Sequence, residues 1–207
     1  YRRSAENIAN KCRNGQWKLC VIAAEGDKTE PNYFTTFQAE YREAFEKANL
    51  HVEFLDKKSE HSDPKYVEET LSKFCDELEG RYDIQEYDEL WFVTDTDDYH
   101  NRNGIILKLR KQCSEKPNYY LALSNPCFEI WLMLHFVSLD GSIREYVGED
   151  VPEDLSIKNH IEAMPIKRRP QICKRLLHHI HKNPPELYKK YIQKIREAIP
   201  RGRELGD

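Results

Sequence analysis

Residues 19–26 read Leu-Cys-Val-Ile-Ala-Ala-Glu-Gly, and residues 89–98 read Glu-Leu-Trp-Phe-Val-Thr-Asp-Thr-Asp-Asp. Each stretch is an apolar run that ends on acidic residues, and the runs predict strands over residues 19–24 and 89–94. A continuous apolar run is typical of a buried strand in a parallel sheet, whose two faces are both covered. In open α/β sheets, functional groups gather at the carboxyl ends of the strands. The two stretches therefore predict a parallel sheet with an acidic, cation-binding edge.

The remaining predicted elements alternate between strand and helix. Shorter strands are expected over residues 51–55 and 119–123, and helices over residues 29–48, 64–78 and 105–115. Residues 124–126 are expected to cap an apolar helix that reaches Val137, and further helices are expected over residues 156–163, 170–181 and 185–198. This alternation predicts an α/β sandwich of about four parallel strands flanked by helices, with a helical C-terminal appendage. We place the two domains at residues 1–140 and 141–207.

The composition fits one domain with a small appendage. The chain has 207 residues, of which 39% are hydrophobic and 33% are charged, enough for a sizeable core. Its six cysteines form no CxxC pair, which argues against a disulfide framework or a zinc site and favours a reducing, cytoplasmic setting. No stretch approaches the length of about 20 apolar residues that spans a bilayer, so no membrane partner is expected.

Positive charge is concentrated near the C-terminal end, although the formal net charge is -4. In residues 158–203, lysines and arginines far outnumber acids, which favours a polyanionic partner. Nucleic-acid contacts are expected at Lys167, Arg168, Arg169, Lys174 and Arg175. Tyr188 and Tyr191 are candidates to stack an unpaired base. The alternative is a solvated helical face that binds no partner.

Asp95 and Asp97 are expected to point to the same side of an extended chain, because side chains alternate along a strand. Two carboxylates on one side suit a hard cation such as Mg²⁺ or Mn²⁺, which takes oxygen ligands. Asp98 would face the other way, together with Thr96. The alternative is an acidic turn in which Asp98 caps the segment that follows.

Glu25 follows the first strand, and Gly26 next to it allows a backbone path that a side chain would obstruct. Glu25 is a candidate to bind the cation or to act as a general acid or base, and the alternative is a surface glutamate beside a turn. Two unit charges about 4 Å apart repel by roughly 4 kcal/mol at an effective dielectric of about 20. If Glu25 converges with Asp95 and Asp97, a bound cation or a proton must relieve that repulsion.

The first predicted helix has two notable residues at its start. Thr29 is expected to be its N-cap. Glu30 follows, and the preference for acids in the first turn of a helix is enough to explain it.

Residues 124–131 read Ser-Asn-Pro-Cys-Phe-Glu-Ile-Trp and follow the fourth predicted strand. The start of this segment should therefore reach the same sheet edge as the acidic clusters. Glu129 lies one helical turn after Asn125, which predicts that the two share a helix face. Glu129 is a candidate to bind the metal or to orient a ligand, and the alternative is a first-turn acid on a core helix. His135 lies among apolar residues and is expected to be a core histidine.

Three ordered motifs resemble the RloB family: Glu25-Gly26 with residues 29–34 (Thr-Glu-Pro-Asn-Tyr-Phe), Asp95-Thr96-Asp97, and residues 124–136. The resemblance covers roughly residues 18–137 and is looser past residue 141. Proteins of this family resemble compact members of the Toprim superfamily, so the resemblance implies a Toprim-like sandwich. It implies that Glu25 is the general acid or base and that Asp95 and Asp97 hold Mg²⁺. Glu129 matches the acid of the family's own motif.

The resemblance also implies a function. RloB-like proteins are associated with phage defence and with a neighbouring ATPase, and related Toprim proteins cut nucleic acid, with tRNA among their targets. The resemblance implies a metal-dependent endonuclease that acts on RNA in preference to DNA and has an ATPase partner. A DNA endonuclease, a non-catalytic module that docks on the ATPase, and a homo-oligomeric assembly stay open. A phosphatase of the haloacid dehalogenase type is disfavoured. In that class the first aspartate is a nucleophile on the earliest core strand, whereas here the aspartate pair follows the third predicted strand.

Overall fold

The computed structural model describes the chain in separate stretches. They are residues 11, 14, 17–24, 26, 28–55, 84–96, 99–147, 155–180 and 187–204. Within them, the side chains of residues 55, 99–103, 105, 187 and 204 are not described. The helix expected over residues 64–78 lies outside these stretches.

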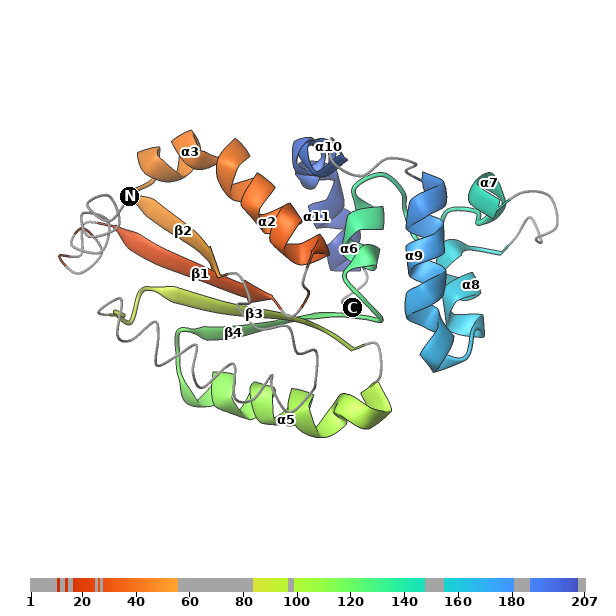
Figure 1. Cartoon of the computed structure of the whole chain (residues 1–207), viewed down its shortest axis with the longest axis horizontal. Helices are drawn as coiled ribbons and strands as arrows, with labels where there is room; N and C mark the ends of the chain where they lie inside the picture. Colours follow the sequence, from red (N-terminus) through yellow and green to blue (C-terminus); the bar gives the residue numbers. More distant parts are fainter. Residues whose placement is uncertain are drawn as a thin grey trace. The chain divides into compact units, whose positions relative to one another are not determined.

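Four strands form one parallel sheet in the order β2-β1-β3-β4, which confirms the predicted α/β fold class (Figure 1). Their bounds are Lys18–Ala24 for β1, Leu50–Leu55 for β2, Glu89–Asp95 for β3 and Tyr119–Ser124 for β4. In the register, Cys20 pairs with Val52 of β2 and with Glu89 of β3. At the other end of β1, Ala24 pairs with Val93. The carboxyl ends of β1 and β3 therefore lie next to each other.

Helices lie on both faces of this sheet (Figure 1). On one face, α2 (Thr29–Glu40) and α3 (Arg42–Lys47) pack against β2. The ring of Phe34 in α2 stacks on Phe54 of β2, with centroids 5.6 Å apart. On the opposite face lies α5 (Tyr99–Glu115), whose Leu109 joins a core cluster with residues of β1, β3 and β4.

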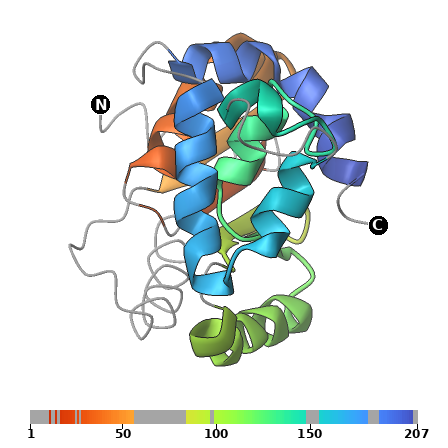
Figure 2. The ribbon, with the colours of Figure 1, turned by 90° about the vertical axis from the view of Figure 1, so that its right-hand side faces the viewer.

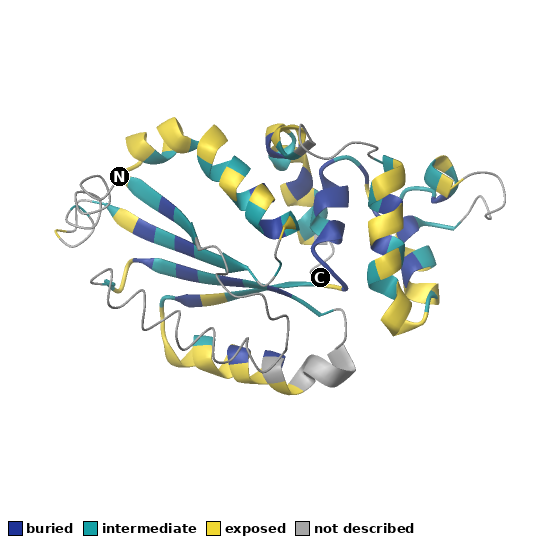
Figure 3. Ribbon diagram, viewed as in Figure 1, coloured by how far each residue is buried: buried dark blue, intermediate teal, exposed yellow. Residues whose placement is uncertain are grey.

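Burial alternates along the central strands (Figure 3). In β3, Leu90, Phe92 and Thr94 are buried, whereas Trp91 and Val93 between them are half-buried. Leu90 and Phe92 pack with Leu109 of α5 in the core cluster. The sequence predicted full cover on both faces; among the described residues of β1 and β3, the buried apolar side chains lie toward α5, and those that alternate with them are half-buried.

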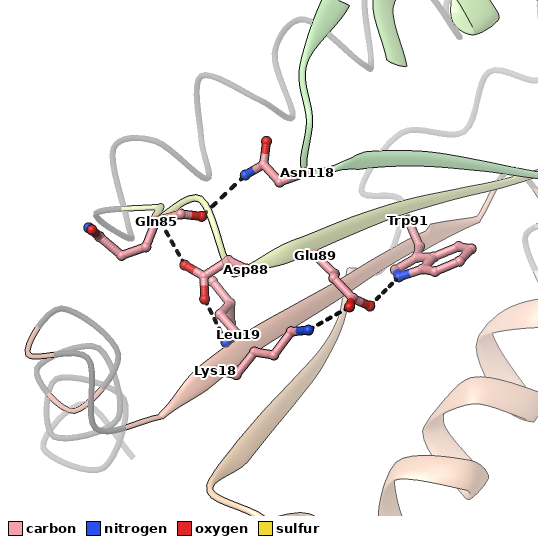
Figure 4. A network of polar contacts seen from close by, with 7 residues as sticks. All are labelled: Lys18, Leu19, Gln85, Asp88, Glu89, Trp91 and Asn118. Carbon is pink, nitrogen blue, oxygen red and sulfur yellow. Dashed lines mark hydrogen bonds and ion pairs between the residues drawn. The ribbon is translucent and has the colours of Figure 1, made fainter. Parts of the chain in front are cut away.

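The amino end of the sheet is organised by a buried aspartate (Figure 4). Asp88 is 1% exposed. It accepts hydrogen bonds from the backbone N–H groups of Leu19 and Gln85, each at 2.8 Å. Next to it, Glu89 pairs with Lys18 and accepts a hydrogen bond from the Trp91 indole. These bonds tie the start of β1 to the start of β3, at the end of the sheet opposite the predicted site.

Contacts divide the chain into two compact units. The first comprises residues 1–94 and 100–122 and contains the sheet except for the last residues of β3 and β4. The second comprises residues 95–99 and 123–207. The domain boundary at residue 140 stays a prediction.

Helices build the second unit, and they can be followed in Figure 2. Their bounds are Glu129–Leu134 for α6, Arg144–Val147 for α7, Ile157–Ala163 for α8, Ile166–Arg168 for the 3₁₀ helix η1, Arg169–Ile180 for α9, Leu187–Gln193 for α10 and Ile195–Glu204 for α11. α9 packs against α6, α7 and α8, and α11 packs against α6. A core cluster that includes Met133, Ile143, Ile157 and Leu176 joins α6, α8, α9 and α11.

The helices differ from their predicted bounds more than the strands do. The expected helix over residues 29–48 is broken at Tyr41 into α2 and α3. Thr29 is not the cap; Lys28 holds that position and makes no side-chain capping bond. α5 begins at Tyr99 instead of residue 105, because Gly104 is accommodated inside the helix at a cost of about 1 kcal/mol. The last predicted helix is split at Lys194 into α10 and α11.

Candidate active site

The predicted acidic edge begins where β1 and β3 end side by side. Glu25 follows Ala24 directly, and it lies outside the described residues, as do Asp97 and Asp98. Asp95 is the last residue of β3, two positions after Val93, the partner of Ala24. Oδ1 of Asp95 is buried. The register thus pairs Ala24, the residue before Glu25, with Val93 of β3.

Thr96 joins the aspartate motif to the segment after β4. Its backbone N–H donates to the carbonyl of Ser124 at 2.8 Å. Its hydroxyl lies 3.2 Å from the same carbonyl and donates to Oδ1 of Asn125 at 3.0 Å. The structure therefore brings two motifs together that are almost 30 positions apart in the sequence. Both lie in the second unit.

Glu129 starts the next helix instead of sitting inside it. α6 begins at Glu129 with Phe128 as its N-cap, and the peptide bond between Asn125 and Pro126 is cis. The prediction that Asn125 and Glu129 share a helix face is therefore wrong, because Asn125 precedes the helix and bonds to Thr96. The predicted reach to Val137 is also too long, since α6 ends at Leu134.

The carboxylate of Glu129 is buried and faces a lysine. Only 8% of Glu129 is exposed. Nζ of Lys174, on α9, lies 3.9 Å from its Oε1, and the Lys174 side chain is 65% exposed. The pair therefore joins a residue predicted to bind metal to one predicted to bind nucleic acid. An ion pair with so exposed a lysine contributes about 0–1 kcal/mol, so Lys174 can exchange partners readily.

Cys127 and His135, whose side chains are often reactive in active sites, have structural roles here. The Cys127 thiol is 1% exposed, and a hydrogen bond with Cys173, followed by burial, raises its pKa far above the ordinary value. A thiol in that state is a poor nucleophile. His135 is 0% exposed, and its Nδ1 donates to the carbonyl of Trp131 at 2.8 Å. The prediction that His135 is a core histidine is confirmed.

The metal site stays a prediction. Of the four predicted ligands, Asp95 and Glu129 are described, and Glu25 and Asp97 are not. Among the described residues, no group of three metal-ligating side chains occurs. The oxygen donors of Asp95 and Glu129 are of the type that Mg²⁺ and Mn²⁺ prefer.

The predicted nucleic-acid residues fall into two groups. Lys167 and Arg168 on η1, and Lys174 and Arg175 on α9, are exposed. Arg169, in contrast, serves the fold, because its guanidinium donates to the backbone carbonyls of Met164 at 3.1 Å and Glu162 at 2.7 Å.

The two tyrosines proposed for base stacking also differ. Tyr191 is 1% exposed and packs edge-to-face against His135 and Phe136. The suggestion that it stacks a base is therefore wrong. Tyr188 is half-buried, and its role stays a prediction.

Glu30 is a residue whose role the sequence did not reveal. It is 8% exposed, and its carboxyl group lies directly against Gly26. Its place in a first turn explained its presence, so nothing in the sequence set it apart from exposed first-turn acids such as Glu43. The one available signal was its position, five residues after Glu25 in the same motif.

Comparisons with known proteins bear on the whole chain. A family model described as RloB-like protein matches residues 20–206. No curated protein matches the chain, and no solved structure matches it. The matched range includes the acidic motifs, the segment after β4 and the basic C-terminal region alike.

Proposed function

Because the chain belongs to the RloB-like family, we propose that it is a metal-dependent nuclease that hydrolyses phosphodiester bonds. We propose Mg²⁺ or Mn²⁺ as its cofactor and RNA, in particular tRNA-like RNA, as its substrate. The resemblance to Toprim nucleases supports the chemistry. The association of RloB-like proteins with phage defence and a neighbouring ATPase supports an ATPase partner.

One observation carries the proposal: the hydrogen bonds of Thr96 to Ser124 and Asn125. They hold the aspartate motif against the segment that leads to Glu129. A metal-dependent site needs carboxylates that are distant in sequence to be near one another, held within about 0.5 Å of their working geometry. A threonine between two aspartates that is bonded through both its backbone and its side chain supports that requirement.

Each acidic residue then has a proposed role. A bound metal would neutralise charge on the scissile phosphate and activate a water molecule. Asp95 and Asp97 would hold the metal, and Glu25 would take up or deliver the proton. Glu129 would either contribute an oxygen ligand or hold Lys174 beside the phosphate.

The substrate backbone is proposed to lie along the exposed face of α9. Four of its exposed polar residues recur at helical spacing: Gln171, Lys174, Arg175 and His178. These side chains point away from the core residues Cys173 and Leu176, which are buried on the opposite face. Lys174 joins this face to Glu129. A phosphate bound to Lys174 would thus be near the proposed metal ligand.

Incubation of the purified protein with tRNA, other cellular RNA and plasmid DNA tests the proposal. We expect cleavage of RNA with Mg²⁺ or Mn²⁺. Glu25→Gln, Asp95→Asn and Asp97→Asn should each reduce the rate by at least about 10²-fold, as expected for groups that act in the chemical step. Glu43→Gln, an exposed acid in the first turn of α3, is the matched control and should cleave normally.

The outcomes separate the alternatives. Cleavage that persists in a metal chelator would refute the mechanism. Cleavage of the plasmid alone would identify a DNA endonuclease. A protein that binds an ATPase but cleaves no nucleic acid with either metal would be a docking module instead.

A further inference from the structure

The carboxyl group of Glu30, in the first turn of α2, lies against Gly26. β1 ends at Ala24 and α2 begins at Thr29, with Gly26 between them. A Cβ on Gly26 would overlap Cδ and both carboxyl oxygens of Glu30. The backbone of Gly26 is not in the left-handed region. Glycine is therefore favoured here by this contact and not by the backbone dihedral angles.

The Glu30 carboxyl group has little room to move away. The residue is 8% exposed, so a methyl group placed on Gly26 would have to displace a buried group. Burying a carboxyl group costs free energy unless polar groups surround it. The first turn of a helix supplies such surroundings through its backbone N–H groups.

The helix turn that carries Glu30 is anchored on the sheet. Tyr33, in the next turn, is 2% exposed. Phe34 stacks on Phe54 of β2, and the side-chain amide of Gln38 donates to the backbone carbonyl of Val52. These contacts fix α2 relative to β2, and Glu30 connects this helix to Gly26.

We propose that Glu30 is a positioning residue. By packing its carboxyl group on Gly26, it fixes the backbone of the loop that carries Glu25, the residue before Gly26 in the chain. The inference rests on the proposed function, because it gives Glu30 a role only if Glu25 acts at the metal. Glu30 acts through the loop backbone and is not itself a metal ligand.

Four variants test this role: Gly26→Ala, Glu30→Gln, Glu30→Ala and the Gly26→Ala/Glu30→Ala double variant. For each, the Tm without metal and the Mn²⁺ concentration at half-maximal RNA cleavage are measured. Glutamine has nearly the size of glutamate, so Glu30→Gln should stay close to wild type. Glu30→Ala and Gly26→Ala should each need at least about tenfold more Mn²⁺, because small misplacements near a reacting centre are costly.

The double variant tests the contact itself. It should be no worse than Glu30→Ala alone in either measurement, because the shortened side chain leaves room for the new methyl group. Two controls match the substitutions. Gly104→Ala adds a methyl group that would meet no atom within 4 Å beyond its chain neighbours and the helix's own backbone, and Glu43→Gln removes an exposed first-turn acid. Both should keep the wild-type Mn²⁺ requirement.

Several results would overturn the proposal. Equal damage from Glu30→Gln and Glu30→Ala would mean that Glu30 is a metal ligand. If the wild type responds to Mn²⁺ but the effects of Gly26→Ala and Glu30→Ala add up in the double variant, the positioning role alone is refuted. A wild type that neither cleaves RNA nor changes its Tm with Mn²⁺ would refute the proposed function, and the positioning role with it.

Discussion

His135 lies in the core of the second unit, between the rings of Trp131 and Tyr191. Burial lowers its pKa from 6.5 to about 4, although its hydrogen bond to the Trp131 carbonyl opposes the shift. The imidazole is therefore neutral in the folded protein at pH 7. In the unfolded chain it would be protonated at a higher pH than in the folded one.

This difference makes stability depend on pH. As the pH falls, the unfolded chain binds the proton first, so the free energy of unfolding decreases between pH 6.5 and about 4. The full loss from His135 is about 3 kcal/mol, since each unit of pKa is worth about 1.4 kcal/mol. Urea unfolding at a series of pH values measures this loss. His135→Gln should flatten the acid limb, and parallel curves for the two proteins would contradict the assignment.

Asp95 allows a test of metal binding that does not need a substrate. A metal that binds only the folded protein stabilises it by about 2.7 kcal/mol at 100 times its Kd. In a chain of this size that corresponds to a rise in Tm of roughly 5–10 °C. We expect Mg²⁺ or Mn²⁺ to raise the Tm of the wild type and Asp95→Asn to reduce the rise. An unchanged rise in Asp95→Asn, measured beside Glu43→Gln, would exclude Asp95 as a ligand.

Single residues also show what could and could not be predicted from the sequence. The position of Asp95 at a strand end was predicted correctly, because an apolar run that stops on acid is a local signal. The bonds of Thr96 to Ser124 and Asn125 were not predicted, since hydrogen bonds between distant segments leave no periodic pattern. The burial of Glu30 was missed for the same reason: it depends on the path of a loop. Glu25 and Asp97 stay predictions.

At the scale of helices and strands, predictions likewise succeeded where the signal is local and failed where it depends on distant segments. The predicted strands agree with β1–β4 to within one residue at each described end, because apolar runs define them directly. The start of α6 was misplaced by the proline at position 126, which is common in a first helical turn. Here the segment before Glu129 is instead tied to Thr96. Ser156 shows the opposite case: it was expected to start a helix, and its hydroxyl accepts from the N–H of Asn159 as the N-cap of α8.

α5 offers a prediction at this scale. Gly104 lies inside the helix and is exposed. A Cβ added to it would meet no atom within 4 Å beyond its chain neighbours and the helix's own backbone. Gly104→Ala should therefore stabilise the protein by up to about 1 kcal/mol, because alanine favours the helix and restricts the unfolded chain. Thermal unfolding measures the gain. A lower Tm would mean that α5 does not continue through this position.

At the scale of the whole molecule, charge is distributed unevenly over a chain of net charge -4. The exposed lysines and arginines of η1 and α9 are available to a partner, whereas Arg169 and Arg201 are bound to backbone carbonyls of the fold. None of the described helices has the length and apolar character needed to cross a membrane.

Salt dependence tests the proposed nucleic-acid face. Each phosphate contact releases counterions and contributes about 0.7 to the slope of log affinity against log salt for single strands. Lys174→Ala/Arg175→Ala should weaken RNA binding and lower that slope by roughly 1–2. The matched control is Lys108→Ala/Arg110→Ala, two exposed basic residues on α5. Equal effects of the two double variants would show that binding follows net charge alone.

The second unit is discontinuous in the chain: residues 95–99 belong with residues 123–207, and residues 100–122 between them belong to the first unit. The hydroxyl of Thr96 in the short piece donates to Oδ1 of Asn125 in the long one, a bond that depends on both side chains. Exchanging the second unit between relatives therefore requires two segments to be replaced. A chimera that takes residues 123–207 from a relative should also take that relative's counterpart of residues 95–99. Otherwise the two pieces of the unit come from different proteins, and the side-chain hydrogen bonds between them will not match.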